Sequence, residues 1–160
     1  MLINRIKKSD THELEEVASE IRERILDVVS TKGGHLSSSL GAVDLIVSMH
    51  KVFDVNKDVF MFDVSHQAYA HKLITDRWDK FDGLRQFEGI SGFTKPHESP
   101  YDYFVAGHSS TSLSVAMGAA KAIALKGETE SRIPVVLIGD GSMTAGMVFE
   151  AMNEIGEYKH

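Results

Sequence analysis

A chain of 160 residues with 42% hydrophobic and 25% charged residues has the composition of one globular domain that is large enough to bury a core. Its formal net charge of −6, without a long run of Lys and Arg, argues against nucleic acids and membrane surfaces as partners. The sequence contains no cysteine and no apolar stretch near the roughly 18 residues of a membrane span, so thiolate sites and disulfides are excluded and a cytoplasmic protein is expected.

The first part of the chain is predicted to be helical. Apolar residues recur at helical spacing over residues 12–30, with Thr11 as the candidate N-cap and glycines at 33–34 as the stop. A second apolar series over residues 40–53 predicts another helix, capped by one of the serines at 37–39.

A short apolar run at residues 59–64 predicts a buried strand, and a helix is expected to follow it through about Thr75. His66 stands at the junction between this strand and this helix. His35 stands in the same way between the two preceding helices. Both histidines are therefore expected at the ends of regular elements.

Residues 88–107 are rich in Gly, Pro, Ser and aromatic side chains and show no sustained period, which predicts a long loop of the kind that is usually functional. A helix rich in small residues is expected over 112–125. The residues before it, 107–112, offer backbone amides and hydroxyls that could hold phosphate oxygens. Ordinary N-capping by Ser109 or Ser110 explains the serines equally well.

The most informative stretch runs from Pro134 to Asn153. Its apolar start, residues 134–138, predicts a strand covered on both faces in a parallel sheet. The chain then breaks at Gly139-Asp140-Gly141 and resumes as a helix. Asp140 would place a hard oxygen at the carboxyl end of the strand, where open α/β sheets bind ligands and where Mg²⁺ and phosphate oxygens could complete a site. In the alternative interpretation, Asp140 simply caps the following helix.

The alternation of helices with short apolar strands predicts an α/β fold, in which a mostly parallel sheet carries helices on both faces. His35, His66 and His108 each stand beside a predicted element terminus. A neutral imidazole in such a place can hydrogen-bond phosphate and move protons at a reacting carbonyl. Alternatively, each ring is half-buried and satisfied by backbone carbonyls. A zinc site is not favoured, because the histidines lack the paired spacing of zinc ligands.

Four ordered segments resemble the family of 1-deoxy-D-xylulose-5-phosphate synthases. They are Gly33-Gly34-His35-Leu36-Ser37-Ser38-Ser39-Leu40-Gly41, Asp63 to Lys72, Gly107 to Ser112, and Gly139 to Gly146 followed by Glu150-Ala151-Met152-Asn153. These motifs cover nearly the whole chain, whereas the family's proteins continue with a second cofactor-binding domain and a third domain.

The resemblance implies a transferase that joins pyruvate to D-glyceraldehyde 3-phosphate and releases carbon dioxide, with thiamine diphosphate and Mg²⁺ as cofactors. It also implies a homodimer that serves isoprenoid, thiamine and pyridoxal synthesis. Residues 1–160 would form an incomplete N-terminal diphosphate-binding domain of the thiamine diphosphate-binding fold, with the pyrimidine-binding and C-terminal domains outside this sequence.

The resemblance further implies roles for individual residues. Asp140 would be a ligand of the metal, and His35 would face the substrates and exchange protons or hydrogen bonds with the reacting oxygens. The residues implied around the cofactor are His66, Gly107, His108, Ser109, Gly141 and Ser142. Asn153 could approach the site or could be an ordinary amide on a helix surface.

Two positions depart from the family pattern, because Ser65 replaces a common glycine and Glu154 a residue that is often asparagine or histidine. The family's second metal ligand and its activating glutamate would lie beyond residue 160, so this chain by itself is expected to be an inactive fragment. Two other hypotheses stay open: the diphosphate-binding subunit of a split transketolase-like enzyme, and a non-catalytic domain that binds phosphate ligands or partner chains.

Overall fold

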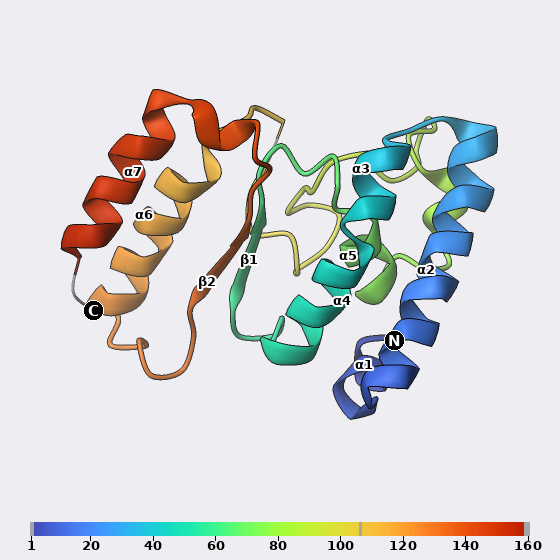
Figure 1. Ribbon diagram of the computed structural model, residues 1–160, viewed down its shortest axis with the longest axis horizontal. Helices are drawn as coiled ribbons and strands as arrows, with labels where there is room; N and C mark the ends of the chain where they lie inside the picture. Colours follow the sequence, from blue (N-terminus) through green and yellow to red (C-terminus); the bar gives the residue numbers. More distant parts are fainter. Residues whose placement is uncertain (1, 106, 159–160) are drawn as a thin grey trace.

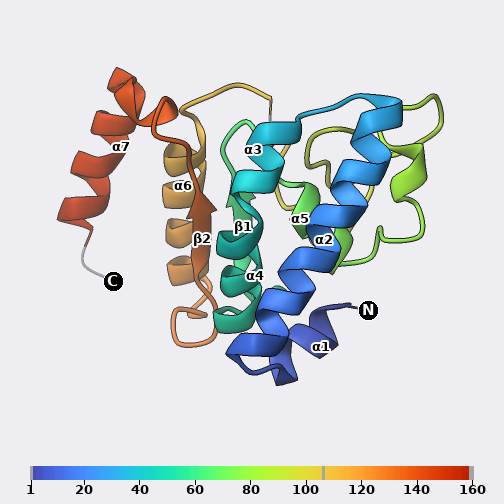
Figure 2. The same cartoon turned by 45° about the vertical axis from the view of Figure 1, so that its right-hand side comes forward.

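Two parallel strands separate two groups of helices in the computed structural model, which describes residues 2–105 and 107–158 (Figure 1). Strand β1 (Val59–Phe62) pairs with strand β2 (Pro134–Leu137), with Val59 opposite Pro134 and Phe62 opposite Leu137. Helices α1 to α5 lie on one side of this pair, and α6 and α7 lie on the other, as the turned view in Figure 2 also shows. The predicted α/β fold with a parallel sheet and helices on both faces is confirmed.

Strand β1 divides its side chains between two hydrophobic cores, because successive residues of a strand point to opposite faces. Phe60 and Phe62 belong to the larger core, which α1, α2, α4 and α5 also fill. Val59 and Met61 pack with residues of α6 in a smaller core. All four residues of β1 are therefore buried, as the apolar run predicted.

Strand β2 packs on both faces, as predicted, because Val135 and Leu137 contact the larger core and Val136 contacts the smaller one, but it is less deeply buried than β1. Of its four residues, Val135 alone is buried. The reason is that β2 has one neighbouring strand, β1, among the residues that the structure describes, so its other edge is open. Helix α7 packs mainly on α6.

Helix α2 (Thr11–Lys32) confirms the helix expected over residues 12–30, but its N-cap is Asp10 and not Thr11. The Asp10 carboxylate accepts from the N–H of Glu13 at 2.9 Å, and the Glu13 carboxylate accepts from the N–H of Asp10 at 2.8 Å. This reciprocal capping box satisfies two helix-end donors, which explains the start one residue earlier. Gly33 ends the helix with a φ of 77°.

The single helix expected over 40–53 is in fact two helices, α3 (Leu36–Gly41) and α4 (Val43–Val52), that meet at Ala42. His35 occupies the N-cap position of α3 without a side-chain capping bond, so the expected serine cap is wrong. Ser39 instead donates its hydroxyl hydrogen to the carbonyl of His66 at 3.0 Å. That bond ties α3 to the turn that follows β1.

The remaining helices mostly follow the expectation. They are α1 (Leu2–Lys8), which was not predicted, α5 (Tyr69–Ile74), α6 (Ser112–Leu125) and α7 (Gly146–Glu157), with single 3₁₀ turns η1 (Phe81–Gly83) and η2 (Ser142–Thr144). The described residues of the long loop, 88–105 and 107, form neither helix nor strand, as predicted, and Ala106 lies outside the described residues. Within the described ranges no helix is long and apolar enough to cross a membrane.

Candidate functional site

Asp63, the residue directly after β1, connects two parts of the chain. Its Oδ1 accepts from the N–H of Ser110 at 2.9 Å, and its Oδ2 accepts from the N–H of Ser112 at 3.2 Å and from the Ser112 hydroxyl at 2.7 Å. This carboxylate therefore caps the start of α6, where capping by Ser109 or Ser110 was the alternative. Thr111 stands at the N-cap position but makes no side-chain capping bond.

Asp63 is held as a buried carboxylate by the donors around it. Burial alone would raise the pKa of Asp63, but hydrogen bonds from the hydroxyls of Ser142 and Ser112 and from the N–H groups of Ser110 and Ser112 keep the pKa below its ordinary value. The Ser110 hydroxyl also donates to the carbonyl of Ser142 at 2.8 Å. The end of β1, the start of α6 and the glycine turn after β2 thus form one hydrogen-bonded unit.

Three of the five described non-glycine residues with a positive φ lie in or beside this unit. Val64, Ser65 and Ser110 have φ angles of 58°, 65° and 71°, in the left-handed region that costs residues with a Cβ roughly 1–2 kcal/mol each. The turn at Val64 and Ser65 presents His66, and the Ser65 Oγ accepts from the N–H of Thr94 at 2.9 Å. Strain of this kind persists where surrounding bonds fix the backbone, and it is typical of functional sites.

A cleft of about 390 Å³ lies between α3, α4 and the end of β2. His66 and Gln67 line it from the β1 side, and Gly139 and Asp140 line it from the β2 side, where Asp140 is exposed. Two buried atoms of this lining, Nδ1 of His66 and Oε1 of Gln67, have no hydrogen-bond partner in the described part of the chain. Since buried polar atoms are normally bonded, these two atoms fit a site that a polar ligand completes.

The alternative role of Asp140 as a helix cap is wrong, because Ala145 occupies the N-cap position of α7. The structure shows no cluster of three or more His, Asp or Glu side chains that could hold a metal among residues 2–105 and 107–158. A metal at Asp140 would therefore need further ligands from phosphate, from water or from other parts of the protein. This donor set fits Mg²⁺, which is usually held by one or two carboxylates and phosphate oxygens.

His35 stands close to the same end of the sheet. Its ring centroid lies 5.7 Å from that of His66, 6.1 Å from that of Tyr69 and 5.3 Å from that of Phe93. The N–H of His35 donates to the Tyr69 hydroxyl at 3.2 Å, and that hydroxyl lies 3.3 Å from His35 Nδ1. Burial, followed by electrostatic repulsion from Arg85 and His66, lowers the pKa of His35. Its imidazole is therefore neutral near pH 7 and able to exchange protons.

Other predicted residues lie on the exposed rim. Gly107, His108 and Ser109 are exposed and do not line the cleft, although the neighbouring Ser110 is bonded to the glycine turn. The N–H groups of Ser110 and Ser112, which were expected to be available to phosphate, are used by Asp63. Gly141 is also exposed, Ser142 is half-buried, and Asn153 lies on the exposed surface of α7.

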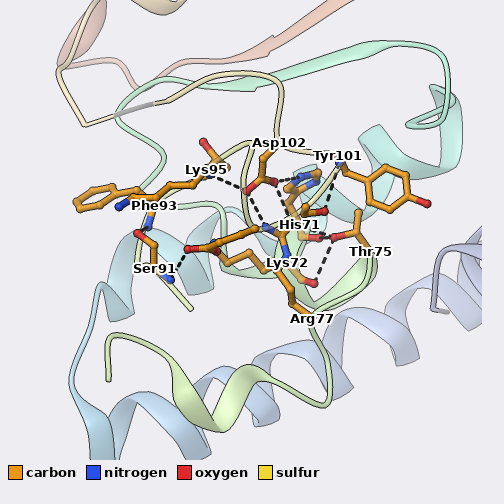
Figure 3. A network of polar contacts seen from close by, with 12 residues as sticks. His71, Lys72, Thr75, Arg77, Ser91, Phe93, Lys95, Tyr101 and Asp102 are labelled. Carbon is orange, nitrogen blue, oxygen red and sulfur yellow. Dashed lines mark hydrogen bonds and ion pairs between the residues drawn. The ribbon is translucent and has the colours of Figure 1, made fainter. Parts of the chain in front are cut away.

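A buried polar network connects α4, α5 and the long loop, and the sequence analysis did not predict it (Figure 3). His71 Nε2 lies 3.1 Å from Asp102 Oδ1, His71 Nδ1 lies 3.0 Å from His50 Nε2, and Arg77 donates to both Asp102 oxygens at 2.6 and 2.9 Å. Burial would raise the pKa of Asp102, but the bonds from His71 and Arg77 hold it far below its ordinary value. Burial lowers the pKa of both histidines, so His71 donates to Asp102 and accepts from His50.

Known proteins of one family are similar to this chain. A family model described as 1-deoxy-D-xylulose-5-phosphate synthase matches residues 2–160. Proteins of that name from a Nitratiruptor species, Sulfurimonas denitrificans and Campylobacter hominis are 72%, 69% and 68% identical to it over 155 residues. Each match covers 97% of this chain and 25–26% of the relative, so the chain spans about a quarter of the length of these curated relatives.

Proposed function

Because the chain belongs to the 1-deoxy-D-xylulose-5-phosphate synthase family, we propose that it forms the diphosphate-binding part of a transferase that joins pyruvate to D-glyceraldehyde 3-phosphate. The reaction releases carbon dioxide and yields 1-deoxy-D-xylulose 5-phosphate, a precursor for isoprenoids, thiamine and pyridoxal. The proposed cofactors are thiamine diphosphate and Mg²⁺. The observation that carries the proposal is the cleft in which Asp140 from the end of β2 and His66 from the end of β1 lie together.

In this proposal the carboxylate of Asp140 binds the metal ion, and phosphate oxygens, water and the family's second protein ligand supply the other ligands. The unpaired Nδ1 of His66 contacts the cofactor from the opposite side of the cleft. The remaining contacts to the cofactor are proposed for the exposed Gly107, His108 and Ser109 and for Gly141 and Ser142 beside the metal ligand. Asp63 holds these segments together through Ser110, Ser112 and Ser142 and does not itself touch a ligand.

Thiamine diphosphate, when bound, supplies the carbanion chemistry of the reaction. The contribution of this chain is to bind the diphosphate, to orient it and to manage protons on the substrate side. His35 suits the last role because its imidazole is neutral near pH 7 and the Tyr69 hydroxyl fixes its ring. With Nδ1 accepting from Tyr69, Nε2–H is free to donate a hydrogen bond to a reacting oxygen.

We place this chain as the N-terminal diphosphate-binding domain of an enzyme with pyrimidine-binding and C-terminal domains, in keeping with relatives about four times its length. The intact enzyme is proposed to be a cytoplasmic homodimer. The synthase name of the relatives favours this assignment over a split transketolase-like subunit and over a non-catalytic binding domain.

Isothermal titration of the intact enzyme with thiamine diphosphate tests the assignment. The wild type should bind in the presence of Mg²⁺ and lose most of its affinity in EDTA, and Asp140→Ala should weaken binding by roughly 100-fold or more. Asp44→Ala, which removes an exposed partner of Arg22, is the control and should bind normally. Wild-type affinity in Asp140→Ala, or no product from pyruvate and D-glyceraldehyde 3-phosphate in the wild type, would contradict the proposal.

A further inference from the structure

Phe93 forms one wall of the surroundings of His35, yet it comes from a loop without helix or strand. The two ring centroids lie 5.3 Å apart, with an angle of 52° between the ring planes. The other groups that face His35 are His66, the Tyr69 hydroxyl and the charge of Arg85. Because regular backbone hydrogen bonds do not fix this loop, side chains must hold Phe93 in place.

Two carboxylates hold the backbone on either side of Phe93. Glu98 Oε1 accepts from the N–H of Ser91 at 2.7 Å, two residues before Phe93. Asp102 Oδ2 accepts from the N–H of Lys95 at 2.8 Å, two residues after it. Each carboxylate thus fixes one end of the short segment 91–95.

Both carboxylates are themselves anchored to α5 and the residues just after it. Lys72 donates to Glu98 Oε2 at 2.8 Å, and Arg77 and His71 bind Asp102. The side chains of Lys72, His71 and Asp102 are 0% exposed. A buried ion pair cannot lose one partner without leaving an uncompensated charge, so these anchors resist rearrangement.

The centre of the segment is fixed to the site itself. Thr94 donates its N–H to Ser65 Oγ at 2.9 Å, in the strained turn that presents His66. Figure 3 shows the Phe93 ring directed away from the buried network, and the ring contact places it against His35. The segment thus connects the buried network, which holds its two ends, with His35, which Phe93 contacts.

We propose that Glu98 and Asp102 are positioning residues, which clamp residues 91–95 so that Phe93 packs against His35 and shapes the substrate side of the site. The assignment of His35 to the substrates rests on the proposed function, whereas the clamp follows from the contacts themselves. Phe93 also excludes water from His35, in keeping with the burial that lowers the pKa of that histidine.

The test uses the intact enzyme and the variants Asp102→Asn, Phe93→Ala and Phe93→Leu. Asp82→Asn is the matched control, because it removes the partner of Arg24 from a pair that joins α2 to η1 at 2.8 Å. Hydrogen exchange at the C2 position of His35, followed by mass spectrometry over a range of pH, reports the pKa of this histidine without needing activity. Steady-state kinetics then give kcat and KM for pyruvate and for D-glyceraldehyde 3-phosphate.

Asp102→Asn and Phe93→Ala are both expected to raise the pKa of His35 towards the ordinary value of about 6.5. Both should lower kcat/KM by roughly 10- to 100-fold, since a small misplacement of a reacting group has effects of this size. Phe93→Leu, which keeps an apolar wall, should restore most of the wild-type pKa, and Asp82→Asn should match the wild type.

A wild-type pKa of His35 in folded Asp102→Asn would overturn the clamp, even if that variant melts at a lower temperature. If Asp102→Asn does not fold, the pKa of His35 is measured in Glu98→Gln instead, because Glu98 holds the other end of the segment. A wild-type pKa in that variant would likewise overturn the clamp. The histidine measurement decides the inference even if the wild-type enzyme makes no product, so failure of the proposed function is seen separately.

Discussion

Replacement of Asp63 by asparagine is expected to destabilise the chain by about 3–5 kcal/mol. Three donors from Ser110 and Ser112 converge on the buried carboxylate. An asparagine whose oxygen takes the place of Oδ2 keeps both Ser112 donors but turns its NH₂ group against the N–H of Ser110. A buried donor left unpaired costs about 1–3 kcal/mol, and each of the two remaining bonds loses about 1 kcal/mol with its charge assistance. One unpaired donor and two weakened bonds give the stated range.

Urea unfolding of wild type and Asp63→Asn, followed by circular dichroism, measures this loss directly. Asp44→Asn is the matched control, because Asp44 pairs with Arg22 on the surface at 2.5 Å and exposed pairs contribute about 0–1 kcal/mol. The amides of Ser110 and Ser112 should also exchange hydrogen faster in Asp63→Asn. A loss within about 1 kcal/mol of the control would refute the role of Asp63 as the anchor of α6.

Three further predictions concern the core and the loops. His50, whose pKa burial lowers far below 6.5, binds fewer protons folded than unfolded, so stability should fall with decreasing pH from about 6.5 downwards. His50→Gln should reduce this dependence of the unfolding free energy on pH by up to about 1.4 kcal/mol per pH unit, as measured by urea unfolding at pH 5–7. An unchanged pH dependence would show that His50 is not its origin. Gly89→Ala should strongly destabilise the chain in thermal melts, because its Cβ would overlap the carbonyl oxygen of Gly83, and a wild-type melting temperature would contradict the packing of this loop. Gly118→Ala in α6 meets no described atom within 4 Å and should instead stabilise by about 1 kcal/mol, whereas a loss would show that this helix face is covered.

The elements that sequence periodicity predicted well are those whose burial repeats along the chain. Helix α2 lies where the apolar pattern placed it, and β1 is buried as its apolar run indicated. Helix α6 lies where the run of small residues placed it. The errors concern helix ends, where local hydrogen bonds and glycine determine the boundary. The capping box chose Asp10 over Thr11, although Glu13 at the third helical position was a visible signal for it. The break between α3 and α4 follows Gly41. Gly41 was a visible stop signal, but the apolar series over residues 40–53 predicted one continuous helix.

Residues of the candidate site could be predicted where their own position in the sequence gives the signal. Residues whose role depends on hydrogen bonds to distant parts of the chain could not. Asp140 and His66 follow strand ends in the sequence, and the structure brings them to one cleft. Asp63 also follows a strand, but its partners lie 47–49 residues away. Asp102 gave no local signal, because its side-chain partners, His71 and Arg77, lie 31 and 25 residues earlier. Such carboxylates become recognisable only when the fold shows which donors surround them.

A crystal structure of the intact enzyme with thiamine diphosphate and Mg²⁺ would test the central assignment most directly. We expect the Asp140 carboxylate to bind an octahedral metal at about 2.0–2.1 Å, with diphosphate oxygens among the other ligands and His66 in contact with the cofactor. A metal and diphosphate bound elsewhere, with Asp140 directed towards solvent, would contradict the account.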